Sequence, residues 1–221
     1  MEPETRPAAI IVGAGPGVSG SFARLLADAG WDVGLVGADE QVLDDLAADL
    51  AERGARVNTA LVDVTDADAA GAALTRMAGR GGHVDLLHFN PSAYREADPL
   101  TLTVPELLED VALGVGALLT AIQAVRPFMS SGARVTVTGS MAADQPSAQA
   151  ASLGVQKAGI RNLVHSLDAT LSPAGIRAVS LTVRGSLSRE GAFTPDRVAQ
   201  ALAEAMRQDE DSWRSEVSYS G

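Results

Sequence analysis

The sequence contains no cysteine, a single lysine and few aromatic residues. The absence of cysteine excludes disulfide bonds, thiolate catalysis and cysteine-ligated metal sites. The three histidines, His83, His88 and His165, are not spaced as metal ligands are. No metal site is therefore expected.

Positive charge is also scarce. There are 17 basic and 28 acidic residues, and the formal net charge is −11. Nucleic acids and anionic membrane surfaces bind basic surfaces, so neither is an expected partner. No stretch approaches the roughly 20 apolar residues that span a bilayer. The first seven residues, which read MEPETRP, lack the basic start and apolar run of a signal peptide. We therefore expect a soluble, cytoplasmic protein.

Short apolar runs alternate with longer helical patterns along the whole chain. This alternation predicts β-α-β crossovers and helices on both faces of a sheet. We expect one α/β domain over residues 1–221, with a Rossmann fold and a doubly wound, mostly parallel sheet of about seven strands. The predicted strands are Ala8–Val12, Asp32–Val36, Val57–Val62, Val84–Phe89, Arg134–Thr138, Ile176–Val183 and Glu216–Tyr219. The predicted helices are Ser19–Ala29, Glu40–Arg53, Ala67–Met77, Pro105–Val125, Ala148–Leu171 and Thr194–Arg207.

One predicted helix is apolar on every side. The segment Val111–Ile122 carries apolar residues around its whole circumference. A helix of this kind is buried all round. Either the rest of the fold or a second subunit must cover it.

A glycine-rich turn follows the first predicted strand. Its glycines are Gly13, Gly15, Gly17 and Gly20, and the last three have the literal spacing G-x-G-x-x-G. Such a turn before a helix presents backbone N–H groups and the positive end of the helix dipole, which favours a pyrophosphate. The alternative is a glycine turn that binds no ligand.

Several motifs, taken in order, resemble those of the short-chain dehydrogenase/reductase superfamily. Gly13 and Gly17 match the family spacing G-x-x-x-G-x-G, whereas its third glycine is replaced by Ser19. Asp63-Val64 resembles the pair that contacts adenine. Phe89-Asn90-Pro91-Ser92 stands where the family has Asn-Asn-Ala-Gly. The resemblance implies a dinucleotide site formed by Gly13, Gly15, Pro16, Gly17, Val18, Asp63, Val64, Asn90, Pro91 and Lys157.

The same resemblance places the catalytic positions. Ser140 corresponds to the serine that binds the substrate oxygen, and Lys157 to the lysine that holds the nicotinamide ribose and lowers the pKa of a catalytic tyrosine. That tyrosine is replaced by Leu153, and an asparagine of the fourth helix by Gly114. Lys157 is the only lysine in the chain, which supports this register. A proton donor held in position typically accelerates a reaction by about 10²–10⁴-fold. Without the tyrosine, the interconversion of ordinary alcohols and ketones should therefore be slower.

Other side chains are candidates near this site. Tyr94 follows Asn90 and either enters the pocket as a proton donor or is an exposed loop residue. Arg95 and Arg184 either orient an acidic substrate or lie on the surface. His88 fits a core histidine better than a catalytic one.

The choice between NAD and NADP is not determined by a family motif. The end of the second strand reads Gly37-Ala38, without the acidic residue of NAD-preferring relatives. Asp39 and Glu40 follow, where they suit the start of a helix. No nearby cation favours NADP, so we expect NAD rather than NADP.

Three functions fit these residues. The first is an NAD(P)-dependent oxidoreductase acting on a small carbonyl or alcohol through an atypical site. The second is a non-redox enzyme, such as an isomerase, dehydratase or cyclase acting on a biosynthetic intermediate. The third is an inactive partner of an active relative. The resemblance also implies a homo-oligomer, dimer or tetramer, formed through the long fourth and fifth helices.

Overall fold

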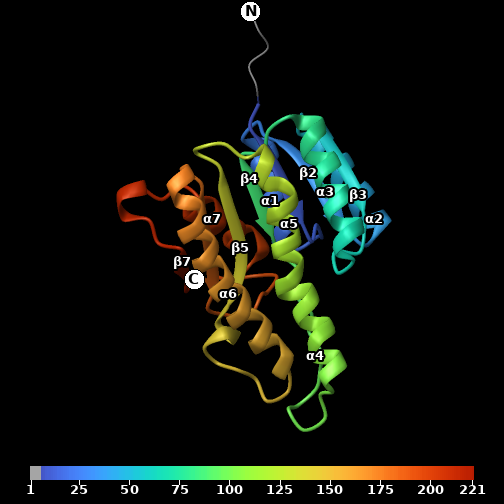
Figure 1. Ribbon diagram of the computed structural model, residues 1–221, viewed down its shortest axis with the longest axis vertical. Helices are drawn as coiled ribbons and strands as arrows, with labels where there is room; N and C mark the ends of the chain where they lie inside the picture. The colour runs from blue at the N-terminus through green and yellow to red at the C-terminus, as the bar shows by residue number, and fades with distance from the viewer. Residues whose placement is uncertain (1–5) are drawn as a thin grey trace, which may run out of the picture.

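A seven-stranded sheet runs through the centre of the molecule (Figure 1). The computed structural model describes residues 6–221; most of the N-terminal segment on which the expectation about a signal peptide rests lies outside them. The strand order is β3-β2-β1-β4-β5-β6-β7, and all neighbouring pairs are parallel. The strands are β1 (Ala8–Val12), β2 (Asp32–Gly37), β3 (Val57–Leu61), β4 (Leu86–Phe89), β5 (Arg134–Ser140), β6 (Arg177–Val183) and β7 (Glu216–Tyr219).

Helices cover both faces of this sheet, as predicted. They are α1 (Val18–Asp28), α2 (Glu40–Glu52), α3 (Ala67–Gly81), α4 (Val104–Val111), α5 (Ala117–Val125), α6 (Ala151–Leu171) and α7 (Pro195–Ala205). Residues of α1, α2 and α7 form one hydrophobic core with the strands. Residues of α3, α5 and α6 form the other. The doubly wound α/β fold is therefore confirmed.

Parallel strands buried on both faces need apolar side chains in succession rather than in alternation. Strand β1 meets this requirement, because Ala9, Ile10, Ile11 and Val12 are all buried. Strand β3 lies at the edge of the sheet and is more exposed, with Leu61 at its end 55% accessible. The central strands therefore hold the two cores apart and bring their carboxyl ends to one edge.

The predicted helix Pro105–Val125 is interrupted in the structure. Helix α4 begins one residue earlier, where Thr103 and Glu106 form a capping box. A π-helical turn, Ala112–Gly116, then separates α4 from α5. Glycine is a poor helix former because it has the most backbone freedom, and this turn contains both Gly114 and Gly116. Such π-turns are frequent at functional sites.

The predicted helix Ala148–Leu171 is shorter at its start. Helix α6 begins at Ala151, because residues 144–149 form an exposed loop after β5. In Figure 1, α4 and the first half of α6 project beyond the carboxyl ends of the strands. These two helices therefore flank the edge of the sheet where the sequence motifs converge.

The segment Val104–Phe128 is long and apolar enough, by length and composition, to cross a membrane. The sequence reading expected no such stretch. In the structure, the buried residues of α5 pack in the core with α3 and β4, which accounts for its composition. One face stays uncovered by the described chain: Leu108 is 60% and Leu119 43% exposed. This chain alone therefore does not bury the apolar helix all round.

Candidate functional site

The glycine turn joins β1 to α1. Its conformation depends on the backbone of Gly13 and on the hydroxyl of Ser19. Gly13 has a φ of +77°, a conformation that favours glycine, and both Gly13 N and Ala14 N donate hydrogen bonds to Val36 O. The hydroxyl of Ser19 donates to Gly13 O (2.9 Å) and accepts from Gly15 N (3.0 Å). Ser19 is 1% exposed. The serine that replaces the family's third glycine therefore closes the turn from inside.

Gly20, one residue after Ser19, lets the first turn of α1 pack closely against the backbone of Gly15. A Cβ atom at Gly20 would collide with the backbone oxygen of Gly15. A Cβ atom at Gly17 would meet nothing within 4 Å, so the space beside Gly17 is open. The packing role of the third glycine has therefore moved to Gly20, while Gly17 leaves room for a ligand.

Helix α1 starts without a side-chain cap. Its N-cap residue is Gly17, and no side chain accepts a hydrogen bond from its first turn. In contrast, Asp39 caps α2, Asp66 caps α3 and Thr194 caps α7. The first N–H groups of a helix lack partners within the helix and attract anions. The start of α1, with Pro16 and Val18 beside it, therefore suits a phosphate group.

The last residue of β2 is a glycine, so the strand end itself carries no acidic side chain. Gly37 ends the strand, and Asp39 caps α2 by accepting a hydrogen bond from Val42 N (3.1 Å). Asp39 therefore serves the helix, as the sequence favours. The last residues of the strand itself, Val36 and Gly37, carry no side chain that would bind a ribose hydroxyl or a phosphate.

Asp63 and Val64 follow β3 and differ in exposure. Asp63 accepts hydrogen bonds from Thr65 N (2.9 Å) and Thr65 Oγ1 (2.7 Å). These bonds hold the pKa of the Asp63 carboxyl below its usual value. Val64 is buried in the core beneath it. Of this pair, only Asp63 presents a polar group, a carboxylate that Thr65 holds in place just after the end of β3.

The loop after β4 meets the glycine turn. Asn90 N donates to Val12 O, which continues the sheet pairing by one residue. The ring of Pro91 lies against Gly13 so closely that a Cβ atom there would be 2.8 Å from Pro91 Cδ. Two predicted cofactor segments, far apart in sequence, are therefore brought together at the strand ends.

Ser140 and Lys157 lie at the carboxyl end of β5. Lys157 Nζ donates to Thr138 O (2.9 Å), and its burial lowers the pKa of the amine to about 8. Ser140 Oγ accepts from Ala142 N (3.2 Å), which orients the hydroxyl. Because an amine in a poorly solvated position favours its neutral form, Lys157 can release a proton near neutral pH.

Glycine lets α6 approach this strand end. A Cβ atom at Gly154 would lie 3.2 Å from Ala142 O, in the turn that follows Ser140. Leu153 is half-buried one residue earlier and offers no group for proton transfer. The position that the resemblance aligns with the family's tyrosine thus carries a hydrocarbon side chain.

Of the other candidates, none is shown to enter the site. Tyr94 is 67% exposed, which fits the alternative of an exposed loop residue. Arg95 forms ion pairs with Asp110 (3.0 Å), Glu106 and Glu109. Arg184 is paired with Asp144 (3.0 Å). Both arginines are therefore engaged by carboxylates of the chain.

Gln156 is a residue that sequence reasoning missed. It is fully buried next to Lys157 and fills the space beside Gly114. A buried glutamine in the middle of a helix gives no motif, so only its polarity next to Lys157 could have drawn attention to it.

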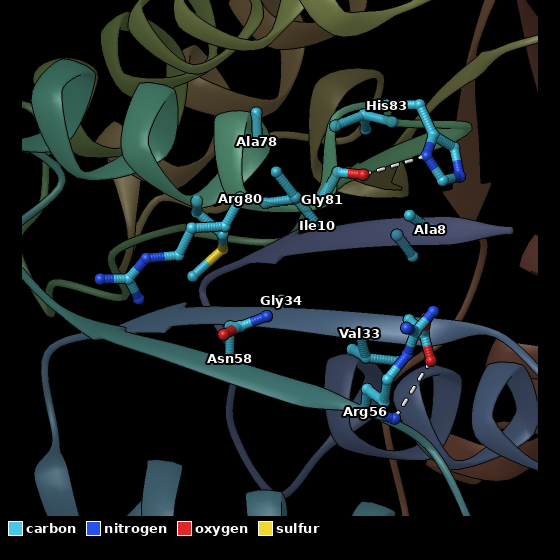
Figure 2. A pocket seen from close by; sticks show the side chains of 14 residues that line it. Ala8, Ile10, Val33, Gly34, Arg56, Asn58, Ala78, Arg80, Gly81 and His83 are labelled. Atoms are coloured by element: carbon cyan, nitrogen blue, oxygen red, sulfur yellow. Dashed lines mark hydrogen bonds and ion pairs between the residues drawn. The ribbon is translucent and has the colours of Figure 1, made fainter. Parts of the chain in front are cut away.

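A separate cavity of about 200 Å³ lies at the opposite edge of the sheet (Figure 2). It is lined by the first residues of β1 and β2 and by the last turn of α3, with Arg56 and His83 at its rim. Arg56 is paired with Asp32, and His83 contacts Gly81 O (3.2 Å). The cavity lies at the amino ends of the strands, away from the glycine turn, and we assign it no role.

Comparison with known proteins shows which proteins this chain resembles. A curated relative, cis-4-hydroxycyclohexanecarboxylate dehydrogenase of Sinomonas cyclohexanicum, is 32% identical over 76% of this chain and 69% of its own length. Sulfoacetaldehyde reductase 2 of Chromohalobacter salexigens is 27% identical over 90% of this chain and 80% of its own length.

Solved structures show the same fold. A short-chain dehydrogenase from Burkholderia cenocepacia in complex with NADP has a TM-score of 0.86, at 23% identity, covering 98% of this chain and 97% of that one. NAD⁺-bound xylitol dehydrogenase has a TM-score of 0.85, at 17% identity, covering 98% of each chain. The family model for short chain dehydrogenases matches residues 7–186. The chain therefore belongs to the short-chain dehydrogenase family and is an oxidoreductase of that family by descent.

Proposed function

We propose that this chain binds a nicotinamide dinucleotide and interconverts a small carbonyl compound and its alcohol. The observation that carries the proposal is Lys157, the only lysine of the chain, which is buried and bonded to Thr138 O near the carboxyl end of β5, the strand that ends at Ser140. The nicotinamide group, when bound, accepts or donates the hydride.

The residues present fit such a cofactor. The open space beside Gly17 and the uncapped start of α1 suit its phosphates. Asp63 and Val64 would border the adenine of the cofactor. Asn90 and Pro91 would border the middle of the cofactor. Lys157 would hold the ribose of the nicotinamide. We favour NAD, because Asp39 and Glu40 at the start of α2 would repel the extra phosphate of NADP.

Ser140 would polarise the carbonyl oxygen of the substrate. Its oxygen already accepts from Ala142 N, so its hydroxyl proton is available to a substrate acceptor. Leu153 cannot supply the proton that the carbonyl oxygen needs, so water, Tyr94 or the substrate must do so. A less effective proton donor predicts slow turnover.

The substrate pocket would be open. The segment 186–193 is short, and the ring of Phe193 packs directly on Gly185. Tyr219 Oη donates to Ala192 O (2.6 Å), which ties the same segment to β7. These contacts tie the segment to the ends of β6 and β7, and a lid this short would fit a more open pocket or a bulky substrate.

Thermal unfolding with NADH, with NADPH and with neither tests cofactor binding. At a ligand concentration about one hundred times the dissociation constant, binding adds about 2.7 kcal/mol and should raise Tm by about 5–10 °C. A rise with one cofactor supports the proposal and identifies the preference. No rise with either contradicts it.

Turnover is then tested on a panel of carbonyl compounds and alcohols. The panel should include 4-hydroxycyclohexanecarboxylate and sulfoacetaldehyde, after the names of the two relatives. The Ser140→Ala variant should lose most of the activity while keeping cofactor affinity. Equal activity of that variant would exclude the assigned role of Ser140.

A second candidate is a non-redox enzyme. The specific observation in its favour is the loss of the tyrosine position to Leu153 together with a Lys157 whose pKa is about 8. Such an amine can remove a proton next to a carbonyl group. This candidate predicts a Lys157-dependent isomerisation or elimination without net hydride transfer, and survival of that activity in Lys157→Ala would exclude it.

We also propose that two copies of this chain associate through the two long helices of the sequence analysis, which are α4 with α5, and α6. Leu108 and Leu119 expose apolar surface on these helices, and Val155 of α6 adds to it at 49% exposure. A second copy covering this face would explain why the segment Val111–Ile122 is apolar all round.

A further inference from the structure

A buried carboxamide lies one residue before Lys157. Gln156 is 0% exposed. Its Oε1 accepts a hydrogen bond from Ala93 N (2.9 Å), and its Nε2 donates one to Ala93 O (3.2 Å). Both ends of the side chain therefore hold a single residue of the loop that follows β4. In this way α6 is tied to a loop more than sixty residues away in sequence.

The opposite side of Gln156 rests on Gly114. A Cβ atom at Gly114 would collide with Gln156 Oε1 and lie 2.9 Å from its Cγ. The glutamine thus occupies a notch that exists because residue 114 has no side chain. The notch lies in the π-helical turn Ala112–Gly116, of which Gly114 is the buried residue. Gly114 and Gln156 are therefore complementary in shape.

The loop held by Gln156 belongs to the candidate cofactor site. Pro91 packs on Gly13 two residues before Ala93, and Arg95 lies two residues after it. Arg95 is paired with Asp110, which is 2% exposed on α4. The loop is consequently anchored to α6 at one residue and to α4 at another.

We infer that Gln156 is a positioning residue for the dinucleotide site, and that its carboxamide, seated in the notch at Gly114, holds the loop Asn90–Arg95 where Pro91 meets Gly13. The family resemblance places a carboxamide side chain at position 114. Here the neighbouring helix supplies the carboxamide instead. The inference rests on the proposed function for its ligand, but the positioning can be measured on the protein without ligand.

The Gln156→Met variant separates hydrogen bonding from packing. Methionine has a similar length and keeps the notch filled, but it makes neither bond to Ala93. In the cofactor-free protein, hydrogen exchange at Ala93 N should become about tenfold faster, the factor that one neutral hydrogen bond supports. Gln200→Met, at an exposed position on α7, is the matched control and should leave this rate unchanged. An unchanged rate in Gln156→Met overturns the inference.

Moving the carboxamide from position 156 to position 114 tests whether the two positions are complementary in shape. Gly114→Asn alone should lower Tm, because the new side chain collides with Gln156. Gln156→Ser alone should also lower Tm, because it empties the notch. The double variant should recover part of the loss, since an asparagine at 114 can reach Ala93 once the glutamine is gone. Strictly additive losses would show that the two positions are independent and would contradict the pairing.

Cofactor affinity decides whether the positioning serves the site. With NADH or NADPH as the probe, Gln156→Met should raise the dissociation constant about tenfold and Gln200→Met should not change it. Faster exchange at Ala93 with unchanged affinity would overturn the role in the site. Absence of binding to the unmodified protein would refute the proposed function, and the exchange rates would still decide whether Gln156 holds the loop.

Discussion

His88 lies fully buried in the centre of the sheet and is kept neutral there. Its Nδ1 contacts Thr136 Oγ1 (2.9 Å), and its ring meets the edge of Phe22 at a centroid distance of 4.9 Å. Its Nε2 has no hydrogen-bond partner among the residues that the structure describes. Burial lowers the pKa of His88 to about 3. The sequence reading of a core histidine agrees with this environment.

This histidine should make the fold sensitive to acid. Below pH 6.5, the ordinary pKa of histidine, His88 binds a proton in the unfolded chain but stays neutral in the native chain. The free energy of unfolding therefore falls as the pH decreases towards 3. The expected slope from this group is about 1.4 kcal/mol per pH unit. Denaturant unfolding at pH 6.5, 5.5 and 5.0 measures it.

His88→Gln should flatten that slope, because glutamine can bond Thr136 without titrating. Asn162→Gln, at an exposed position on α6, removes no titratable group and should keep the original slope. Equal slopes for the unmodified protein and His88→Gln would show that the buried histidine does not control acid stability.

Lys157 offers a direct measurement because the chain has no other lysine. Protein labelled with ¹³C at lysine Cε should give one lysine signal, which titrates with a midpoint at about pH 8. Between pH 8 and 10.5 the unfolded chain retains the proton that the native chain has lost, so stability rises with pH in that window. A midpoint near 10.5 would mean that the amine is solvated, and would remove the support for its use as a base.

At the scale of elements, the glycine turn combines two separate requirements. The turn must fold, which depends on the contact of Gly20 with the backbone of Gly15 and on the hydroxyl of Ser19. It must also leave space for a ligand, which depends on Gly17. The literal spacing of the motif does not distinguish these tasks.

Two alanine substitutions should separate them. Gly20→Ala should lower the free energy of unfolding by about 1–3 kcal/mol, because its Cβ overlaps a backbone oxygen. Gly17→Ala has open space and should cost less than about 1 kcal/mol, the loss of a glycine N-cap, yet it should weaken dinucleotide binding at least about tenfold. Denaturant unfolding and cofactor titration provide the two readouts. Equal cofactor affinity in Gly17→Ala would place the phosphates elsewhere.

At the scale of the whole molecule, the uncovered face of α4 and α5 predicts self-association. Sedimentation velocity of the unmodified protein should show a dimer or tetramer. Leu119→Glu should shift it to the monomer, because a buried unpaired carboxylate is costly at an apolar contact. Leu61→Glu, on the edge strand β3 at 55% exposure, is the matched control and should change nothing. A monomeric unmodified protein would contradict the proposed interface.

The arginines show how charge is distributed over the fold. Arg95, Arg161 and Arg177 each pair with carboxylates of the chain, the last with Asp168 at 2.7 Å. These pairs hold neighbouring elements together rather than facing a ligand. The two arginines that the sequence offered as substrate-orienting groups, Arg95 and Arg184, are both engaged in this way.

The sequence by itself determined the fold, the sheet and the positions of the main motifs. Apolar runs such as Ile10–Val12 specify buried parallel strands, because both of their faces must be covered. The glycine turn could be recognised because it follows the first strand and precedes a helix, whereas Asp63, Ser140 and Lys157 were proposed from the resemblance to the family. Helix starts with a strong cap, such as Asp39 before α2, were also predictable because capping is local.

Only the tertiary structure decided what depends on contacts between distant residues. The π-turn at Gly114, the seat of Gln156 and its bonds to Ala93 arise from three segments that meet in space. Likewise, Ser19 could be read as a missing glycine until its hydroxyl was seen to close the turn. A periodic pattern reports which side of an element is buried, but not which side chain fills a given space. That is decided by packing between elements, where shape and hydrogen-bond partners must match at once.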